Sequence, residues 1–172
     1  MKSNKNTVSG QEGLLTLPGF PLILVVVKNN IITVAATSFF SFNPPMVMIG
    51  IVPSRYTYEL IQSSNDYTIN LPTEDLLSAV RICGSKSGRD VNKWELAALT
   101  PENSISVSSL LIKECPVNLE CKIVKKIQLR ECSHVWFIGE IITAHIRSDY
   151  DRSKALMYWP REYRRIGSVI ND

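Results

Sequence analysis

Residues 29–57 read NNIITVAATSFFSFNPPMVMIGIVPSRYT, and this stretch decides the fold. The pair Asn29-Asn30 precedes an apolar, β-branched run, and Asn tolerates the positive φ of a tight hairpin turn. Pro44-Pro45 cannot donate ladder hydrogen bonds, so the chain should leave the sheet there. A second apolar run, Met46 to Val52, follows. The stretch therefore predicts two strands separated by a polar corner.

Two groups of hydroxyl side chains interrupt these apolar runs. The first is a corner at Thr37, Ser38 and Ser41, next to Ala35 and Ala36. Small side chains would let a flat ring approach the backbone, whose N–H groups can bond the edge of the ring. The second group is the sequence PSRYT at residues 53–57. Together they predict a site for a planar, phosphorylated cofactor, and an ordinary hydroxyl-rich turn is the alternative for the first group.

The second group begins a predicted helix. Ser54 to Ser63 has side chains at helical spacing and follows a predicted strand. Free backbone N–H groups and the helix dipole at its amino end favour an anion. The hydroxyls of Ser54 and Thr57, with the Arg55 cation, would complete a phosphate site. A capped surface helix with a solvated arginine is the alternative.

The remaining segments predict the fold class. The strand Pro21 to Lys28 should pair with IITVAAT at residues 31–37, both covered on two faces. Further predicted elements are a strand at Asp66 to Leu71, a helix at Thr73 to Cys83 capped by Thr73, a short helix from Asn92 to Leu99, and paired strands at Val117 to Leu129 and His134 to Ile146. Strands in runs favour an α+β fold with a mostly antiparallel β-barrel and a few short helices over a Rossmann sheet.

The composition describes one globular domain. A chain of 172 residues with 45% hydrophobic and 20% charged residues fits a single core. We expect the polar residues 1–13 to form a flexible N-terminal arm and residues 14–172 to form the domain. A net charge of +3, mostly scattered, argues against a nucleic-acid partner. The absence of a signal-peptide apolar region and the shortness of the early apolar run, Leu22 to Val27, predict no membrane partner and a cytoplasmic protein.

The cysteines do not predict a metal site. The four of them, at positions 83, 115, 121 and 132, contain no Cys-x-x-Cys pair and none of the usual zinc spacings. We expect free thiols, some of them in the core.

Four segments in the same order resemble those of a known family. They are NIITVAATSFFSFNPP at residues 30–45, SGRDVNKWE at Ser87 to Glu95, SHVWFIGEI at Ser133 to Ile141, and the tail from Tyr158 to Gly167. The chain is similar to the flavin reductase-like family with the FMN-binding split-barrel fold over about residues 15–167. Asn92 stands where the family has Asp, and Trp94 where it has Phe.

The resemblance implies a homodimer that binds one FMN per subunit. It implies hydride transfer from NAD(P)H to flavin and then to free flavin, a ferric chelate or a partner protein, with no catalytic acid or base required. The implied cofactor-binding residues are Thr33, Ala36, Thr37, Ser38, Ser41, Ser54, Arg55, Tyr56, Thr57, Lys93 and Tyr158. His134 would lie near the nicotinamide or substrate. The alternative for Lys93 is an exposed lysine at the start of a helix, and for His134 it is a hydrogen-bonded or merely exposed histidine without a binding role. For Tyr158 the alternative is core packing.

Two other functions stay open. A flavoredoxin-like electron carrier would hold FMN tightly and take electrons from a protein, without significant NAD(P)H activity. A small β-barrel module would bind single-stranded nucleic acid. The modest charge and the lack of interleaved aromatic and basic residues argue against the second.

Overall fold

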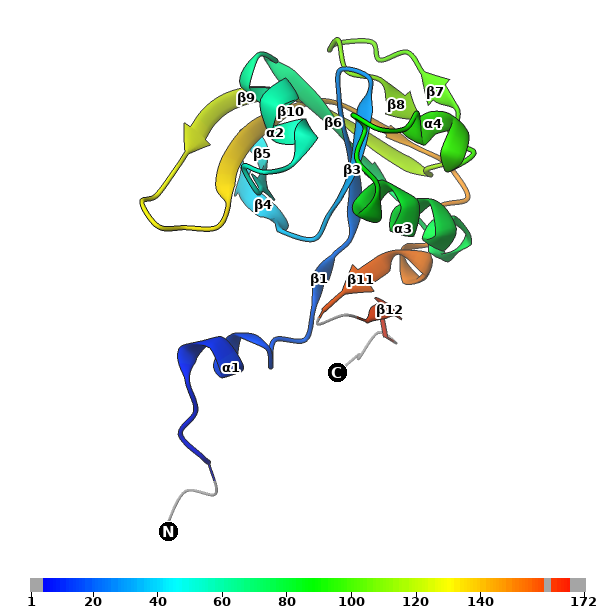
Figure 1. Cartoon of the computed structure of the whole chain (residues 1–172). Helices are drawn as coiled ribbons and strands as arrows, with labels where there is room; N and C mark the ends of the chain where they lie inside the picture. Colours follow the sequence, from blue (N-terminus) through cyan, green and yellow to red (C-terminus); the bar gives the residue numbers. More distant parts are fainter. Residues whose placement is uncertain (1–4, 160–161, 168–172) are drawn as a thin grey trace.

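The computed structural model describes residues 5–159 and 162–167, and its centre is a curled antiparallel sheet (Figure 1). Its strands are β2 (Ile23–Val27), β3 (Asn30–Val34), β4 (Thr37–Phe42), β5 (Pro45–Ile51), β6 (Asp66–Leu71), β9 (Val117–Ile127) and β10 (Val135–Ile146). They pair in the order β3-β2-β6-β9-β10-β5-β4, each antiparallel to its neighbours. The sheet forms a half-barrel, which confirms the predicted α+β class.

Two small sheets and several short helices complete the described residues. One sheet joins β1 (Phe20–Pro21), β11 (Leu156–Tyr158) and β12 (Tyr163–Arg165), and the other pairs β7 (Pro101–Glu102) with β8 (Leu111–Ile112). The helices are α1 (Gly10–Leu14), α2 (Tyr56–Gln62), α3 (Leu77–Ser85) and α4 (Lys93–Leu96), with 3₁₀ turns η1 (Glu74–Leu76) and η2 (Arg152–Lys154). None of these helices is long and apolar enough to cross a membrane.

Helix α1 lies apart from the barrel in Figure 1. Its N-cap Ser9 accepts a hydrogen bond from the backbone N–H of Glu12, and the Glu12 carboxylate accepts one from the Ser9 backbone. The sequence predicts an arm over residues 1–13, so this capped turn is a local structure that the prediction lacks. The flexibility of the arm stays a prediction.

Strand β2 separates two hydrophobic cores. Leu24 and Val26 face a core that α3 and α4 cover, whereas Ile23, Val25 and Val27 face the interior of the curled sheet. All five residues are buried, which confirms the prediction of a strand covered on both faces. The neighbouring strand β3, at the edge of the same sheet, packs against α3.

The segment from Thr37 to Phe42 is a strand, so the predicted corner at Thr37, Ser38 and Ser41 is wrong. β4 pairs with β5 up to Phe42 opposite Pro45, so that only residues 43–44 form the turn. Pro44 lies in the turn, but Pro45 begins β5 opposite Phe42, so the prediction that the chain leaves the sheet at both prolines is wrong for Pro45. A proline at the first position of a strand is compatible with pairing. The corner lies instead at residues 35–36, where the carbonyl of Ala36 accepts a hydrogen bond of 2.7 Å from the N–H of Gly50.

Other predicted elements are confirmed with small changes. β2 pairs with β3, but the turn lies one residue early, at residues 28–29, and Lys28 has φ of 56°. The long strands β9 and β10 pair as predicted. Thr73 precedes η1 and makes no side-chain cap, whereas Asn92 caps α4 by accepting from the N–H of Trp94 at 3.1 Å.

Candidate functional site

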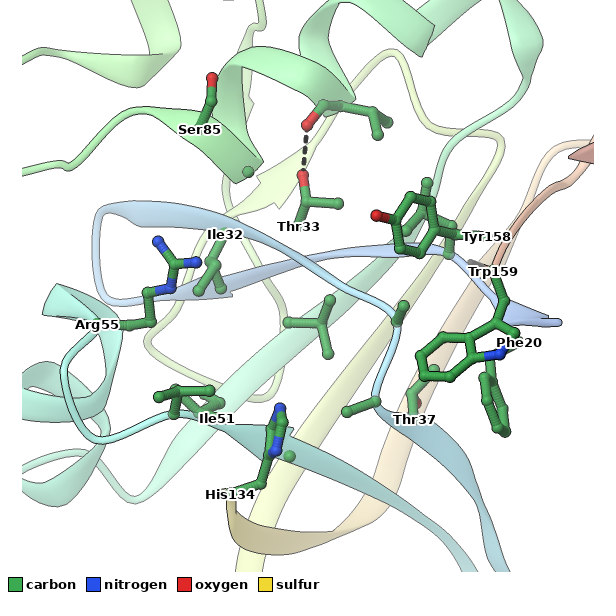
Figure 2. Close-up of a pocket in the computed structure, with 18 of the residues that line it drawn as sticks. Phe20, Ile32, Thr33, Thr37, Ile51, Arg55, Ser85, His134, Tyr158 and Trp159 are labelled. Carbon is green, nitrogen blue, oxygen red and sulfur yellow. Dashed lines mark hydrogen bonds between the residues drawn. The ribbon is translucent and has the colours of Figure 1, made fainter. Parts of the chain in front are cut away.

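A cavity of about 820 Å³ lies beside β3, the end of β5 and the small β1-β11-β12 sheet (Figure 2). Its lining includes the small residues Ala35, Ala36, Thr37 and Gly50. A Cβ at Gly50 would come within 3.1 Å of the Cβ of Ala36 and 3.3 Å of the Trp136 ring, so a larger residue at this position would crowd both neighbours. A flat ring system can approach the backbone over such a surface.

Aromatic side chains form another part of this large cavity. Phe20 and Trp159 pack edge to face with ring centres 5.5 Å apart, and the Trp159 indole N–H donates to the carbonyl of Leu14 at 3.3 Å. The ring centres of Tyr158 and Tyr163 lie 5.2 Å apart. Figure 2 shows Phe20, Tyr158 and Trp159 gathered at one end of the cavity and Arg55 at the other. One end is therefore apolar and aromatic, and the other carries a cation.

A smaller pocket of about 130 Å³, here called the basic pocket, adjoins the cationic end. It shares four lining residues with the large cavity: Ile32, Arg55, Gly84 and Ser85. Its other lining residues include Ser54, Tyr56, Thr57, Ser87, Arg89 and Lys93. Hydroxyl groups and cations therefore meet where the large cavity ends.

Lys93 is the buried cation of the basic pocket. Its residue is only 5% exposed, and its Nζ donates to the carbonyls of Ile31 at 2.7 Å and Cys83 at 2.9 Å. An ammonium group has three N–H donors, so the third donor of Lys93 has no acceptor among the described residues. No carboxylate of the described residues lies within 4.0 Å of the side-chain nitrogens of Lys93 or Arg55.

The surroundings of Lys93 favour an anionic ligand. Burial lowers the pKa of Lys93; the Cys83 thiol beside it acts in the opposite direction, and the Arg55 cation lowers the pKa further. Burial likewise raises the pKa of Cys83 to about 11, although Lys93 opposes that shift. A buried ammonium group without a counter-charge is stabilised when an anion binds beside it.

Hydroxyl groups add donors to the basic pocket. Thr57 is buried, and its hydroxyl accepts a hydrogen bond of 2.8 Å from the side-chain amide of Asn30, which leaves its own hydrogen to donate. Helix α2, which begins beside it, has only seven residues. The side-chain donors, and not a long helix dipole, therefore carry the case for an anion here.

A sequence model of the flavin reductase-like domain matches residues 19–167. The chain belongs to this family. An uncharacterised protein of Archaeoglobus fulgidus is 36% identical over 131 residues, which are 76% of this chain and 73% of that protein. This membership confirms the resemblance seen in the sequence and indicates a flavin-related redox function.

Solved structures share the fold of this flavin reductase-like chain. A flavoredoxin from Methanosarcina acetivorans matches with a TM-score of 0.87 at 24% identity, over 99% of this chain and 95% of its own. An FMN-binding protein from Thermus thermophilus matches with a TM-score of 0.82 at 17% identity, over 100% and 99% of the two chains. At these identities the likeness shows the split-barrel fold alone.

Most of the predicted site residues of this family member line the two compartments. The large cavity has Thr33, Ala36, Thr37, Arg55, His134 and Tyr158, and the basic pocket has Ser54, Arg55, Tyr56, Thr57 and Lys93. The hydroxyls of Thr33 and Thr37 already donate to the carbonyls of Val80 and Met48. Because their hydroxyl hydrogens are already used, these two residues contribute to ligand binding mainly by being small and leaving space.

Two predicted residues lie elsewhere. Ser38 is exposed and Ser41 partly exposed on β4, and neither lines the large cavity or the basic pocket. Side chains alternate between the faces of a strand, so Thr37 and Ser38 cannot both face the cavity. The misplaced corner in the sequence prediction is the cause.

Several lining residues were not predicted. Among them are Phe20, Arg81, Ser85, Ser87, Arg89 and Trp136. Ser87 and Arg89 belong to the segment SGRDVNKWE, which the family resemblance had already singled out. Phe20 and Arg81 lie in no motif, so the sequence carries no local signal for them.

His134 lies at the edge of the large cavity, as Figure 2 shows. Its Nδ1 lies 2.9 Å from the Ser133 hydroxyl, and its ring centre lies 6.4 Å from that of Trp136. Burial lowers the pKa of His134 and so favours its neutral imidazole form. No group of three or more His, Cys, Asp or Glu side chains in the described part of the chain is placed to hold a metal ion.

Proposed function

We propose that this chain binds FMN, with the ring in the large cavity and the phosphate in the basic pocket. We propose further that it is an FMN-dependent oxidoreductase, taking hydride from NAD(P)H and passing the electrons to free flavin, a ferric chelate or a partner protein. The observation that carries the proposal is Lys93, a buried cation with no carboxylate partner among the described residues, in the basic pocket that adjoins a cavity lined by small residues.

The chain's own residues would hold and orient the cofactor. Lys93 and Arg55 would offset the phosphate charge, and the hydroxyls of Ser54 and Thr57 would donate hydrogen bonds to it. Small residues at 35–37 and Gly50 allow close approach of the ring. Tyr158 and Trp159, which line the far end, would limit the access of water to the ring. When bound, the flavin supplies the two-electron chemistry, so the protein needs no acid or base of its own.

His134 would meet the substrate as a neutral group. A neutral imidazole can donate one hydrogen bond and accept another. Placed at the cavity edge, it would orient a nicotinamide amide or an acceptor without adding charge to the site.

We also propose a cytoplasmic homodimer. Phe39, Phe40 and Phe42 are 63%, 48% and 83% exposed on the edge strand β4. Exposed aromatic side chains next to one another are typical of a protein interface. The free cysteines suit a reducing compartment. Sedimentation of the wild type and of Phe42→Ser tests the dimer, because a monomeric wild type would refute it.

A flavoredoxin-like electron carrier is the second candidate. The residues proposed to hold FMN would serve an electron carrier equally well, and a flavoredoxin shares this fold with a TM-score of 0.87. Such a carrier would hold FMN at the same site but would exchange electrons with a protein and not with NAD(P)H.

A spectrum distinguishes these functions. The purified protein is mixed with FMN, freed of excess, and treated with NADH or NADPH without oxygen. Bleaching of the flavin band at about 450 nm by NAD(P)H supports the oxidoreductase. Bleaching by dithionite alone supports the carrier. A protein that retains no FMN and does not bind it in titration refutes both.

A further inference from the structure

The two residues that flank Asn30 bind helix α4. The carbonyl of Asn29 accepts a hydrogen bond of 3.0 Å from the Trp94 indole N–H, and the carbonyl of Ile31 accepts one of 2.7 Å from Lys93. Both donors are buried, and their acceptors lie 65 and 62 positions earlier in the chain. The backbone of Asn30 is therefore held on both sides by contacts to α4, next to the basic pocket.

The side chain of Asn30 binds helix α2. It is buried, and its Nδ2 donates to the Thr57 hydroxyl at 2.8 Å. An amide nitrogen is only a donor, so the Thr57 oxygen must act as the acceptor in this bond. The hydroxyl hydrogen is then left for a different acceptor, and the hydroxyl makes no second hydrogen bond to the described residues. A buried donor without an acceptor therefore lines the basic pocket.

Gly88 lies against the other end of the Asn30 amide. A Cβ added at Gly88 would collide with the Oδ1 of Asn30 and would lie 3.2 Å from the Tyr56 ring. The amide group thus fills the space between Gly88 and Thr57. A larger residue at position 88 would push the amide out of this space and away from Thr57.

We propose that Asn30 is a positioning residue that makes the site prefer a phosphorylated flavin over an unphosphorylated one. By donating to Thr57, Asn30 leaves the hydrogen of that hydroxyl for a phosphate oxygen. Asn30 does not line the basic pocket, so it acts through Thr57 and not by touching the ligand phosphate. The proposal rests on the proposed function, in which the FMN phosphate lies in the basic pocket.

Calorimetric titration of FMN and riboflavin into flavin-free Asn30→Asp tests this role. Aspartate has the shape of asparagine, but its ionised carboxylate is only an acceptor and would take the Thr57 hydrogen. We expect FMN to bind about tenfold more weakly than to the wild type, and riboflavin to change by less than about threefold. Asn29→Asp is the matched control, because it adds the same charge at the neighbouring exposed residue. It should change FMN affinity by less than about threefold.

A double-mutant cycle with Thr57→Val shows whether Asn30 acts through the hydroxyl. Valine preserves the size of threonine, and we expect Thr57→Val alone to weaken FMN by about three- to tenfold. In that background, Asn30→Asp should weaken FMN by less than about threefold more, because the hydroxyl that Asn30 orients is gone. A full tenfold loss in that background would overturn the proposal, since the new charge would then act on the ligand directly.

Two further outcomes would overturn the positioning role. They are an unchanged FMN affinity in Asn30→Asp, and an equal loss of FMN and riboflavin, which would make Asn30 a residue of the fold alone. If the wild type binds neither flavin, the proposed function itself has failed. Should Asn30→Asp not fold, Gly88→Ala carries the test, because its Cβ displaces the amide and should weaken FMN several-fold more than riboflavin. Equal losses of the two flavins in Gly88→Ala would then refute the role.

Discussion

Two regions of the barrel bury charge, and they compensate it in different ways. In the basic pocket, Lys93 donates to two neutral carbonyls and has no counter-charge among the described residues. Near the β7–β8 connection, the Asp66 carboxylate accepts four hydrogen bonds from the chain. The backbone N–H and hydroxyl of Ser109 bond one oxygen at 3.0 and 2.6 Å, and those of Ser108 bond the other at 3.0 and 2.8 Å.

The carboxylate of Glu120 is compensated in the same way as that of Asp66, by hydrogen bonds from the chain. Its fully buried carboxylate accepts from the N–H groups of Ile105 at 2.9 Å and Ser106 at 2.6 Å, and from the imidazole of His145 at 2.7 Å. Burial alone would raise the pKa of this carboxyl and of Asp66, but the hydrogen bonds hold both pKa values below their ordinary range. The two carboxylates accept hydrogen bonds from the loop at residues 105–109 and so hold that loop in place. The Lys93 ammonium, without a counter-ion among the described residues, instead favours binding of an external anion.

Asp66→Ala should have the largest effect, on stability. The change leaves two serine N–H groups without their acceptor, and an unsatisfied buried donor costs about 1–3 kcal/mol. We therefore expect the free energy of unfolding in urea to fall by about 3 kcal/mol or more. FMN affinity of the folded fraction should change by less than about twofold. A comparable loss of FMN affinity would show that the two regions are not independent.

Lys93→Met should have the next largest effect, on ligand affinity. Methionine preserves the apolar stem but removes the cation, and a hydrogen bond to a charged group contributes about 1.5–3 kcal/mol. We expect calorimetry to show FMN weakened about 10- to 100-fold and riboflavin, which lacks the phosphate, weakened by less than about threefold. Lys113→Met, on the exposed surface, is the control. Equal losses for the two flavins would mean that Lys93 only supports the fold.

Acid should reduce the stability that the carboxylates of Asp66 and Glu120 provide. A carboxyl whose folded pKa lies below its unfolded value stabilises the protein above the unfolded value and loses this contribution as the pH falls through the folded one. For Asp66 and Glu120 the ordinary values are 3.8 and 4.5. The free energy of unfolding should therefore decrease as the pH drops below about 4.5. Urea titrations at several pH values should show a shallower decrease for Asp66→Ala, and an equally steep one would contradict this account.

Ser38→Ala should have the smallest effect. Ser38 lines neither the large cavity nor the basic pocket, although the sequence had predicted it as a cofactor ligand. We expect the dissociation constant for FMN to stay within about twofold of the wild-type value. Fluorescence titration is sufficient to measure it. A tenfold loss would mean that the β4 face takes part in binding, for example across a dimer.

Much of the fold could be read from local pattern. The apolar run at 23–27 and the alternation at 117–127 predicted paired strands, because side-chain period and burial are encoded in neighbouring residues. β4 was missed because its exposed aromatic and hydroxyl residues do not follow the alternation of a half-buried strand. Local pattern cannot show that its backbone pairs with β5.

For the site, the sequence by itself determined which residue types are available for binding. They are the hydroxyls and the cation at 54–57, the small residues at 35–37, and the four segments typical of the family. Only the tertiary structure decided that Lys93 is buried, because its partner Ile31 lies 62 residues away and meets it where α3 and α4 pack on β3. The same holds for the aromatic wall, in which Phe20 meets Trp159. Burial and convergence depend on packing between distant segments, and they turn an ordinary lysine into a candidate ligand for phosphate.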